Sequence, residues 1–247
     1  RRLAAQDLER LVGAAGFRAA PSVLMLPLEE EFGWTRTELS LAVTVNLLLS
    51  GSGQDTKGAG ADTLVSIENL VGSAFGDTLT GDGRANQIEG GAGDDVLTGG
   101  GGDDVLDGGA GDDTISSGLG ADQIIGGLGI DTADYKLSSA AVTIANDGTA
   151  GAGGWAQGDV LSGIERIEGS QLYGDTLKGG TTSSTVLWGW GGNDIFVSFG
   201  QADSIDGGTG TDTIDYSASL AGVTVRLDGT ASSGGDAAGD VIINVET

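Results

Sequence analysis

The stretch GGAGDDVLTGGGGDDVLDGGAGDDTI, residues 90–115, repeats a glycine-rich segment and an Asp-Asp pair every nine residues. The spacing extends in both directions, because the chain divides without gaps from Gly72 to residue 134 into seven nine-residue units. A second run of three such units covers residues 189–215. A short fixed period of this kind is typical of a solenoid, in which each unit stacks on its neighbours.

Two positions of each unit keep their chemical character. Position 8 is always apolar, and position 6 is Asp in every unit except the second, where Asn86 takes its place. Glycine dominates positions 1, 2 and 4, where it permits the positive φ angles of a tight turn. Positions 7–9 are therefore expected to form a short strand whose position-8 side chain points into the core.

Two consecutive units are expected to form one coil of eighteen residues, so that the turns alternate between two edges of a roll. Strands of successive coils lie about 4.8 Å apart, which stacks the position-6 side chains in a row along each edge. Without a cation, each neighbouring pair of carboxylates would repel by about 1–3 kcal/mol. The predicted rows are Asp77, Asp95, Asp113 and Asp131 on one edge, and Asn86, Asp104 and Asp122 on the other.

This pattern resembles the RTX nonapeptide repeat, G-G-x-G-x-D-x-U-x, which is a calcium-binding β-helix signature. The resemblance covers roughly residues 40–247 and implies an all-β fold, a parallel β-roll or β-helix solenoid. It implies several Ca²⁺ ions between adjacent turns, held by position-6 carboxylates and by carbonyls of the glycine-rich turns. Asn86 lacks charge and would weaken its site. The predicted ligands are Asp77, Asp95, Asp104, Asp113, Asp122, Asp131, Asp175, Asp194, Asp203 and Asp212, with Gly91, Gly93, Gly100, Gly102, Gly109 and Gly111.

Other metals suit this composition less well than calcium. Zinc prefers nitrogen or sulfur ligands, and the chain contains neither histidine nor cysteine. Magnesium tends to keep its bound waters. The apolar core is thin and residues 72–134 carry a net charge of −12, so calcium binding is expected to supply the free energy of folding.

The RTX resemblance also implies a cellular context. Such proteins are exported unfolded through type I secretion machinery and fold on meeting extracellular calcium. The chain is accordingly predicted to be a secreted or cell-surface, monomeric and non-catalytic module of a larger bacterial protein. Two interpretations of the parent protein stay open: a secreted enzyme or toxin (protease, lipase, epimerase or hemolysin) with this chain in its tail, or a structural or adhesive surface protein.

The composition excludes several classes of function. The 247 residues include 48 glycines, no cysteine and no histidine, and the formal net charge is −25. Catalysis by imidazole or thiol groups is therefore excluded. The acidic charge argues against binding to nucleic acid or to anionic membranes, and no apolar run is long enough for stable membrane insertion. A flexible linker would not keep an apolar residue on a nine-residue period.

A longer repeat surrounds the nine-residue units. GIDTADYKLSSAAVTI at 129–144 returns 81 residues later as GTDTIDYSASLAGVTV at 210–225. Tyr135 and Tyr216 are equivalent in it, which favours packing roles at the end of each run. The predicted organisation is a first β-roll over 41–144 and a second over 145–247, truncated at its C-terminal end.

Several residues fall outside the simple repeat. Asp94, Asp103 and Asp112 at position 5 are interpreted as solvated outward charges. Residues 179–188 have no carboxylate in the position-6 slot, so no ion is assigned there. Trp188 and Trp190 are interpreted as packing residues at this change of register, with a carbohydrate platform as the alternative.

The first 40 residues differ in composition from the repeats. Residues 1–12 are expected to form a short helix, and the segment 1–40 is predicted to be a helical cap or a fusion fragment. Residues 16–45 resemble an N-terminal fragment of a major facilitator transporter. Residues 42–47 alternate as a strand.

Overall fold

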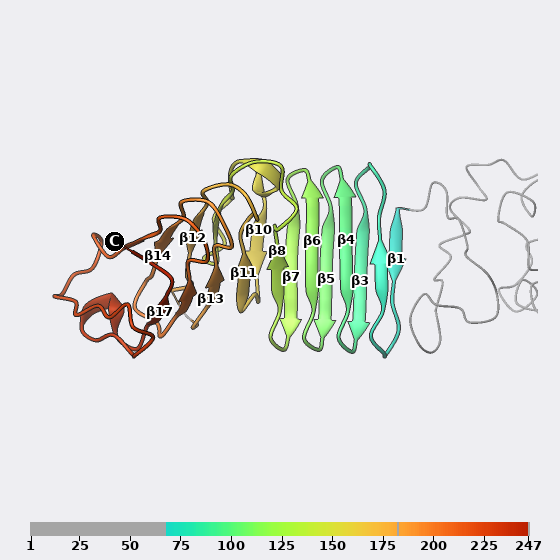
Figure 1. Ribbon diagram of the computed structural model, residues 1–247. Helices are drawn as coiled ribbons and strands as arrows, with labels where there is room; N and C mark the ends of the chain where they lie inside the picture. The colour runs from blue at the N-terminus through green and yellow to red at the C-terminus, as the bar shows by residue number, and fades with distance from the viewer. Residues whose placement is uncertain (1–67, 182, 247) are drawn as a thin grey trace, which may run out of the picture. The chain divides into compact units, whose positions relative to one another are not determined.

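The computed structural model describes residues 68–181 and 183–246. The predicted N-terminal segment 1–40, the transporter-like stretch 16–45 and the strand at 42–47 lie outside these residues. The described chain is an all-β solenoid built from parallel strands, with two short 3₁₀ turns, η1 (Gly154–Ala156) and η2 (Gly235–Ala237) (Figure 1). The predicted fold class is therefore confirmed.

Within the described residues, the strands form three parallel sheets. The longest, sheet B, contains β2 (Thr78–Thr80), β4 (Val96–Gly101), β6 (Thr114–Leu119), β8 (Thr132–Asp134), β11 (Arg166–Glu168), β13 (Val186–Trp188), β15 (Ser204–Asp206) and β17 (Val241–Ile243). Sheet A contains β1 (Asn69–Val71), β3 (Gln87–Ala92), β5 (Val105–Ala110), β7 (Gln123–Leu128) and β10 (Val160–Ser162). Sheet C contains β9 (Thr143–Ala145), β12 (Thr176–Lys178), β14 (Ile195–Val197) and β16 (Thr213–Asp215).

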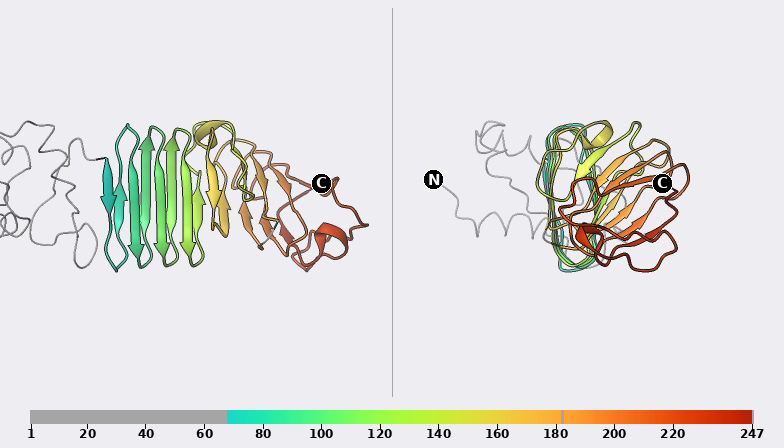
Figure 2. Two further views of the ribbon diagram at one scale, coloured as in Figure 1. Left: turned by 180° about the vertical axis from the view of Figure 1, so that it is seen from behind. Right: turned by 90° about the vertical axis from the view of Figure 1, so that its left-hand side faces the viewer.

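The strand register follows the eighteen-residue coil. Leu79 lies opposite Leu97 and Ile88 lies opposite Leu106, so every second unit occupies the same sheet. Figure 2 shows the resulting coils stacked on one another. Sheet B continues past the predicted boundary between the two rolls, at residues 144 and 145, because β8 on one side pairs with β11 on the other. The other sheet changes from A to C between β8 and β12, where β9, the first strand of sheet C, precedes β10, the last strand of sheet A; the nine-residue period did not predict this change.

Position 8 builds the core as expected. In the first run all seven position-8 side chains are at most 1% exposed, and together they form one apolar cluster. In the second run Phe196 and Ile205 are buried, whereas Ile214 on β16 is only partly buried. Each coil therefore contributes a few inward apolar side chains.

The strands of the first run are longer than predicted. β3 to β7 each contain six residues and continue from position 7 through position 3 of the next unit. Position 1 is consequently extended backbone, and its glycine is required by space: a Cβ on Gly90 would overlap Asp95 Oδ2 and the carbonyl oxygen of Gly108. Position 2 needs glycine for its conformation, since Gly91 has φ 111°.

The 81-residue repeat is reproduced in three dimensions. η1 and η2 are 81 residues apart, and each is preceded by a matching antiparallel bridge, Thr143 with Ala152 and Thr224 with Ser233. No helix in residues 68–181 or 183–246 is long and apolar enough to cross a membrane.

Candidate metal centre

The position-6 side chains are buried although they are carboxylates. Every aspartate predicted as a ligand is at most 3% exposed. The rows that they form follow from the register: Asp77, Asp95, Asp113 and Asp131 precede strands of sheet B, and Asn86, Asp104 and Asp122 precede strands of sheet A. A buried carboxylate requires hydrogen bonds or a cation, because removing its charge from water is costly.

In every predicted aspartate ligand except Asp77, one carboxylate oxygen accepts a hydrogen bond from the backbone of the preceding coil; Asp77 Oδ2 accepts from the Ser73 N–H of its own turn. The Asp95 N–H donates to Asp113 Oδ1 at 2.8 Å, and the Asp113 N–H donates to Asp131 Oδ1 at 2.9 Å. On the other edge, the Asn86 N–H donates to Asp104 Oδ1 at 2.7 Å. We call this chain of bonds the aspartate ladder. It orients the carboxylates that accept its bonds in the same way.

Within residues 68–181 and 183–246, the second oxygen of most of these carboxylates has no hydrogen-bond partner. It is buried and unpaired in eight aspartates: Oδ1 of Asp77, and Oδ2 of Asp95, Asp104, Asp113, Asp122, Asp131, Asp194 and Asp212. Leaving so many anionic oxygens buried without a partner is unfavourable, since each retains its full desolvation cost. The arrangement therefore needs protons or cations along both edges.

Backbone carbonyls from the glycine-rich turns lie at the same interfaces between coils. A Cβ on Gly109 would overlap the carbonyl oxygen of Gly91, and one on Gly111 would overlap that of Gly93. Each of the other predicted carbonyls likewise lies against the glycine eighteen residues later. These pairs are Gly100 with Gly118, Gly102 with Gly120, Gly109 with Gly127, and Gly111 with Gly129. Each coil thus presents backbone carbonyl oxygens to the glycines of the next coil.

Burial raises the pKa values of these aspartates. Desolvation raises the pKa of Asp95, Asp104 and Asp131 to about 6 each, against the opposing effect of the ladder hydrogen bonds. The pKa of Asp194 is raised to about 7, again chiefly by burial and further by Asp175 and Asp212. Repulsion between stacked carboxylates and their loss of hydration therefore both raise the pKa values of these aspartates.

The position-5 aspartates form a second set of bonds in the opposite direction. Asp94, Asp103 and Asp112 are exposed, as predicted. They also accept backbone hydrogen bonds from the following coil: the Asp112 N–H donates to Asp94 Oδ1, and the Ile130 N–H donates to Asp112 Oδ1, both at 2.9 Å. Their interpretation as merely solvated charges was incomplete, because the Asp-Asp pair links each coil to both of its neighbours.

The ladders end on residues that the repeat did not reveal. On one edge the Asp122 N–H donates to Asp159 Oδ1, while Asp159 Oδ2 accepts from the Ser117 and Tyr135 hydroxyls, each bond being 2.9 Å long. On the other edge the Asp131 N–H donates to Glu165 Oε2 at 3.0 Å. Protein donors thus satisfy Asp159 completely, and its pKa is nevertheless raised to about 7 by burial.

The second run ends in the same way, 81 residues later. The Asp203 N–H donates to Asp240 Oδ1, the Tyr216 hydroxyl donates to Asp240 Oδ2, and the Asp212 N–H donates to Glu246. The predicted structural role of the two tyrosines thus includes a specific hydrogen bond. The 81-residue repeat was the signal that could have identified these end residues.

Two predicted ligands differ from the others. Asp175 Oδ2 accepts hydrogen bonds from the Ser170 N–H and hydroxyl, at 2.6 and 2.9 Å. Asp203 Oδ2 accepts one from the Ser198 hydroxyl at 2.9 Å. Their carboxylates accept ladder bonds through Oδ1, and a nearby serine donates a hydrogen bond to Oδ2. The other predicted aspartate ligands have no such donor for their second oxygen within the described residues.

The residues present fit calcium better than a metal held by side chains alone. Within the described residues, no group of three or more carboxylates is placed to hold a metal. An ion at a coil interface would therefore need backbone carbonyls in addition to one or two carboxylates. Such mixed oxygen sets suit the large and flexible coordination sphere of Ca²⁺.

Comparison with known families agrees with this geometry. The family model of the RTX calcium-binding nonapeptide repeat matches in four copies, at residues 71–106, 98–133, 179–214 and 200–218. A search of curated proteins gave no match. The matched residues include both runs of nine-residue units and both edges of the first run. These segments of the chain are RTX calcium-binding nonapeptide repeats, and the ion that such repeats bind is Ca²⁺.

Proposed function

We propose that this chain is a calcium-dependent folding module, in which Ca²⁺ between successive coils permits the roll to form. The observation that carries the proposal is the set of eight buried carboxylate oxygens that have no partner among the described residues. The proposed ligands are the side chains of these eight aspartates, together with backbone carbonyls of the glycine-rich turns at each coil interface. Asp175 and Asp203 are left out of this set because serine already satisfies them.

The electrostatics support coupling between binding and folding. In the folded chain the position-6 carboxylates are stacked and buried, whereas in the unfolded chain they are hydrated and far apart. A cation that neutralises them binds the folded state selectively, and its binding free energy becomes folding free energy. RTX repeats bind calcium, and extracellular calcium modules have dissociation constants of about 10⁻⁴–10⁻³ M, which is the range we expect here.

The cellular context is part of the same proposal. A chain that stays unfolded at low calcium suits export through type I secretion machinery, followed by folding outside the cell. The module acts structurally and not as an enzyme, since its acidic residues are explained by the ladders. A parent protein with a separate catalytic or toxin domain and a surface protein with further repeats are both compatible with this function.

Calorimetric titration tests the proposal directly. Chelator-treated protein is titrated with CaCl₂ and, separately, with MgCl₂. We expect uptake of several calcium ions and much weaker binding of magnesium. Absence of calcium uptake, or equal affinity for magnesium, would overturn the proposal.

Two buried position-6 residues provide a matched pair for the ligand assignment. Asp194→Asn removes an unpaired oxygen and should reduce calcium uptake, whereas Asp203→Asn alters a serine-bonded carboxylate and should leave the number of bound ions unchanged. Equal losses in both variants would contradict the assignment.

A further inference from the structure

Trp190 occupies a position that the repeat reserves for glycine. It is position 2 of the unit 189–197, and its φ is 68°, in the left-handed region where Gly91 and its equivalents lie. A side chain in this region costs about 1–2 kcal/mol. The side chain is 40% exposed, so a large part of the indole surface stays open to solvent. The packing role expected from the sequence therefore involves only part of the ring.

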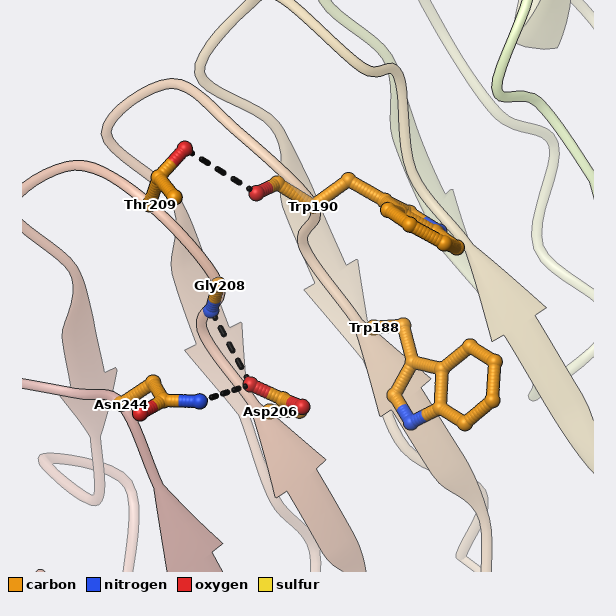
Figure 3. Close-up of a pocket in the computed structure, with 6 residues that line it drawn as sticks. All are labelled: Trp188, Trp190, Asp206, Gly208, Thr209 and Asn244. Atoms are coloured by element: carbon orange, nitrogen blue, oxygen red, sulfur yellow. Dashed lines mark hydrogen bonds between the residues drawn. The ribbon is translucent and has the colours of Figure 1, made fainter.

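A second left-handed residue lies beside it. In the described part of the chain only Trp190 and Asn244 are non-glycine residues with positive φ. Both line the same hollow of about 410 Å³, together with Trp188, Asp206, Gly208 and Thr209 (Figure 3). Strained backbone positions concentrate at binding sites more than elsewhere, and the volume suits a small ligand.

The two indole rings form one wall of the hollow. Their centroids are 6.0 Å apart and their planes are nearly perpendicular, at 87°. A cation already lies over each ring: the Lys136 ammonium is 5.6 Å from the Trp190 centroid, and the Arg166 guanidinium is 5.1 Å from that of Trp188. Salt bridges to Asp134 and Glu168 fix Lys136 in place.

The opposite wall offers hydrogen-bonding groups. Asp206 Oδ1 accepts from the Gly208 N–H at 3.1 Å and from Asn244 Nδ2 at 2.8 Å, which orients both side chains (Figure 3). Asp206 Oδ2 and the Asn244 side-chain oxygen make no hydrogen bond within the described residues. The hollow therefore combines exposed aromatic surface with two free acceptors.

We propose that this hollow binds a neutral saccharide. The apolar C–H face of a sugar ring would pack on the indole rings, and its hydroxyl groups would donate to Asp206 and Asn244. A cationic ligand such as a quaternary ammonium is disfavoured, because Lys136 and Arg166 already supply positive charge at both rings. Anionic ligands are disfavoured by Asp206 and by the net charge of −25. The proposal does not depend on which residues bind calcium.

The test uses the full chain at saturating calcium. Trp emission and calorimetry are followed during titration with cellopentaose, maltopentaose, mannopentaose and chitopentaose, and separately with choline chloride. We expect at least one of the oligosaccharides to bind. Failure of all four to bind, or binding of choline alone, would overturn the proposal.

Three variants separate binding from folding. Trp190→Gly restores the residue type of the repeat and relieves the left-handed strain, although it also removes the contacts of the indole with Trp188 and Lys136. Its fold is checked by circular dichroism at saturating calcium, and the folded variant should bind the saccharide at least about tenfold more weakly. Asp206→Asn should also weaken binding. Phe75→Ala removes a 59% exposed aromatic ring in the first coil and should bind normally. Unchanged affinity in folded Trp190→Gly would contradict the site.

Discussion

Neutralising Asp104 should have opposite effects with and without calcium. Burial raises the pKa of Asp104 from 3.8 to about 6, opposed by the Asn86 hydrogen bond and reinforced by the charges of Asp122 and Asp103. Because the pKa of Asp104 is higher in the folded than in the unfolded chain, protonation of this carboxyl group stabilises the folded state, and this contribution is fully present below about pH 3.8. It is lost as the pH rises through about 6. At neutral pH the ionised carboxylate therefore destabilises the calcium-free roll.

The magnitude follows from the shift. Two pKa units correspond to about 3 kcal/mol, which solvent screening reduces to about 1–2 kcal/mol. Asp104→Asn should stabilise the calcium-free roll by that amount, and Asn86 shows that this position accommodates an amide. With calcium the same variant loses an anionic ligand, so the calcium midpoint of folding should rise.

The assay compares both conditions. In chelator, the protein is titrated with trimethylamine N-oxide, an osmolyte that favours compact states, and folding is followed by the β signal in circular dichroism. The Asp104→Asn variant should fold at a lower osmolyte concentration than the wild type. The control is Asp103→Asn, an exposed neighbour whose bond from the Ala121 N–H an amide oxygen can keep. The reasoning is refuted if Asp104→Asn destabilises both states, or if Asp103→Asn behaves identically.

Three further predictions follow from the buried polar groups. In chelator, lowering the pH from 7.5 to about 4.5 should increase β structure, because the raised pKa values of Asp95, Asp131 and Asp194 favour their protonated forms; dichroism that falls with pH would contradict this. Tyr135→Phe removes a donor to Asp159 and should lower the free energy of unfolding by about 1–3 kcal/mol in urea at saturating calcium, whereas Tyr173→Phe, at an exposed residue, should be neutral. Gly108→Ala should prevent normal coil stacking, because its Cβ overlaps Asp113 Oδ2, while Gly83→Ala meets no atom within 4 Å; similar melting temperatures for the two would disprove the steric argument.

The nine-residue period was sufficient to predict the main features of the fold. It gave the eighteen-residue register, the buried position-8 side chains and the two rows of aspartates, because these depend only on spacing along the chain. It did not predict the transition from sheet A to sheet C, which begins in the irregular segment after β8.

The details of the candidate site depended on contacts that spacing does not encode. Asp159 joins a ladder through a residue 37 positions earlier, so no short period marks it. Asp175 has the same place in the ladder as Asp194, yet Ser170 satisfies only Asp175. The strained Trp190 and Asn244 became visible as a pair only once their backbone angles and the hollow between them were known.

Calcium is expected to make the roll fold. The most direct test of this expectation is a calcium titration of the chelator-treated protein, followed by far-UV circular dichroism and Trp fluorescence, with magnesium as the control. We predict a cooperative gain of β signal with calcium and none with magnesium at the same concentrations. A spectrum already rich in β structure in chelator at neutral pH, and unchanged by calcium, would contradict the account.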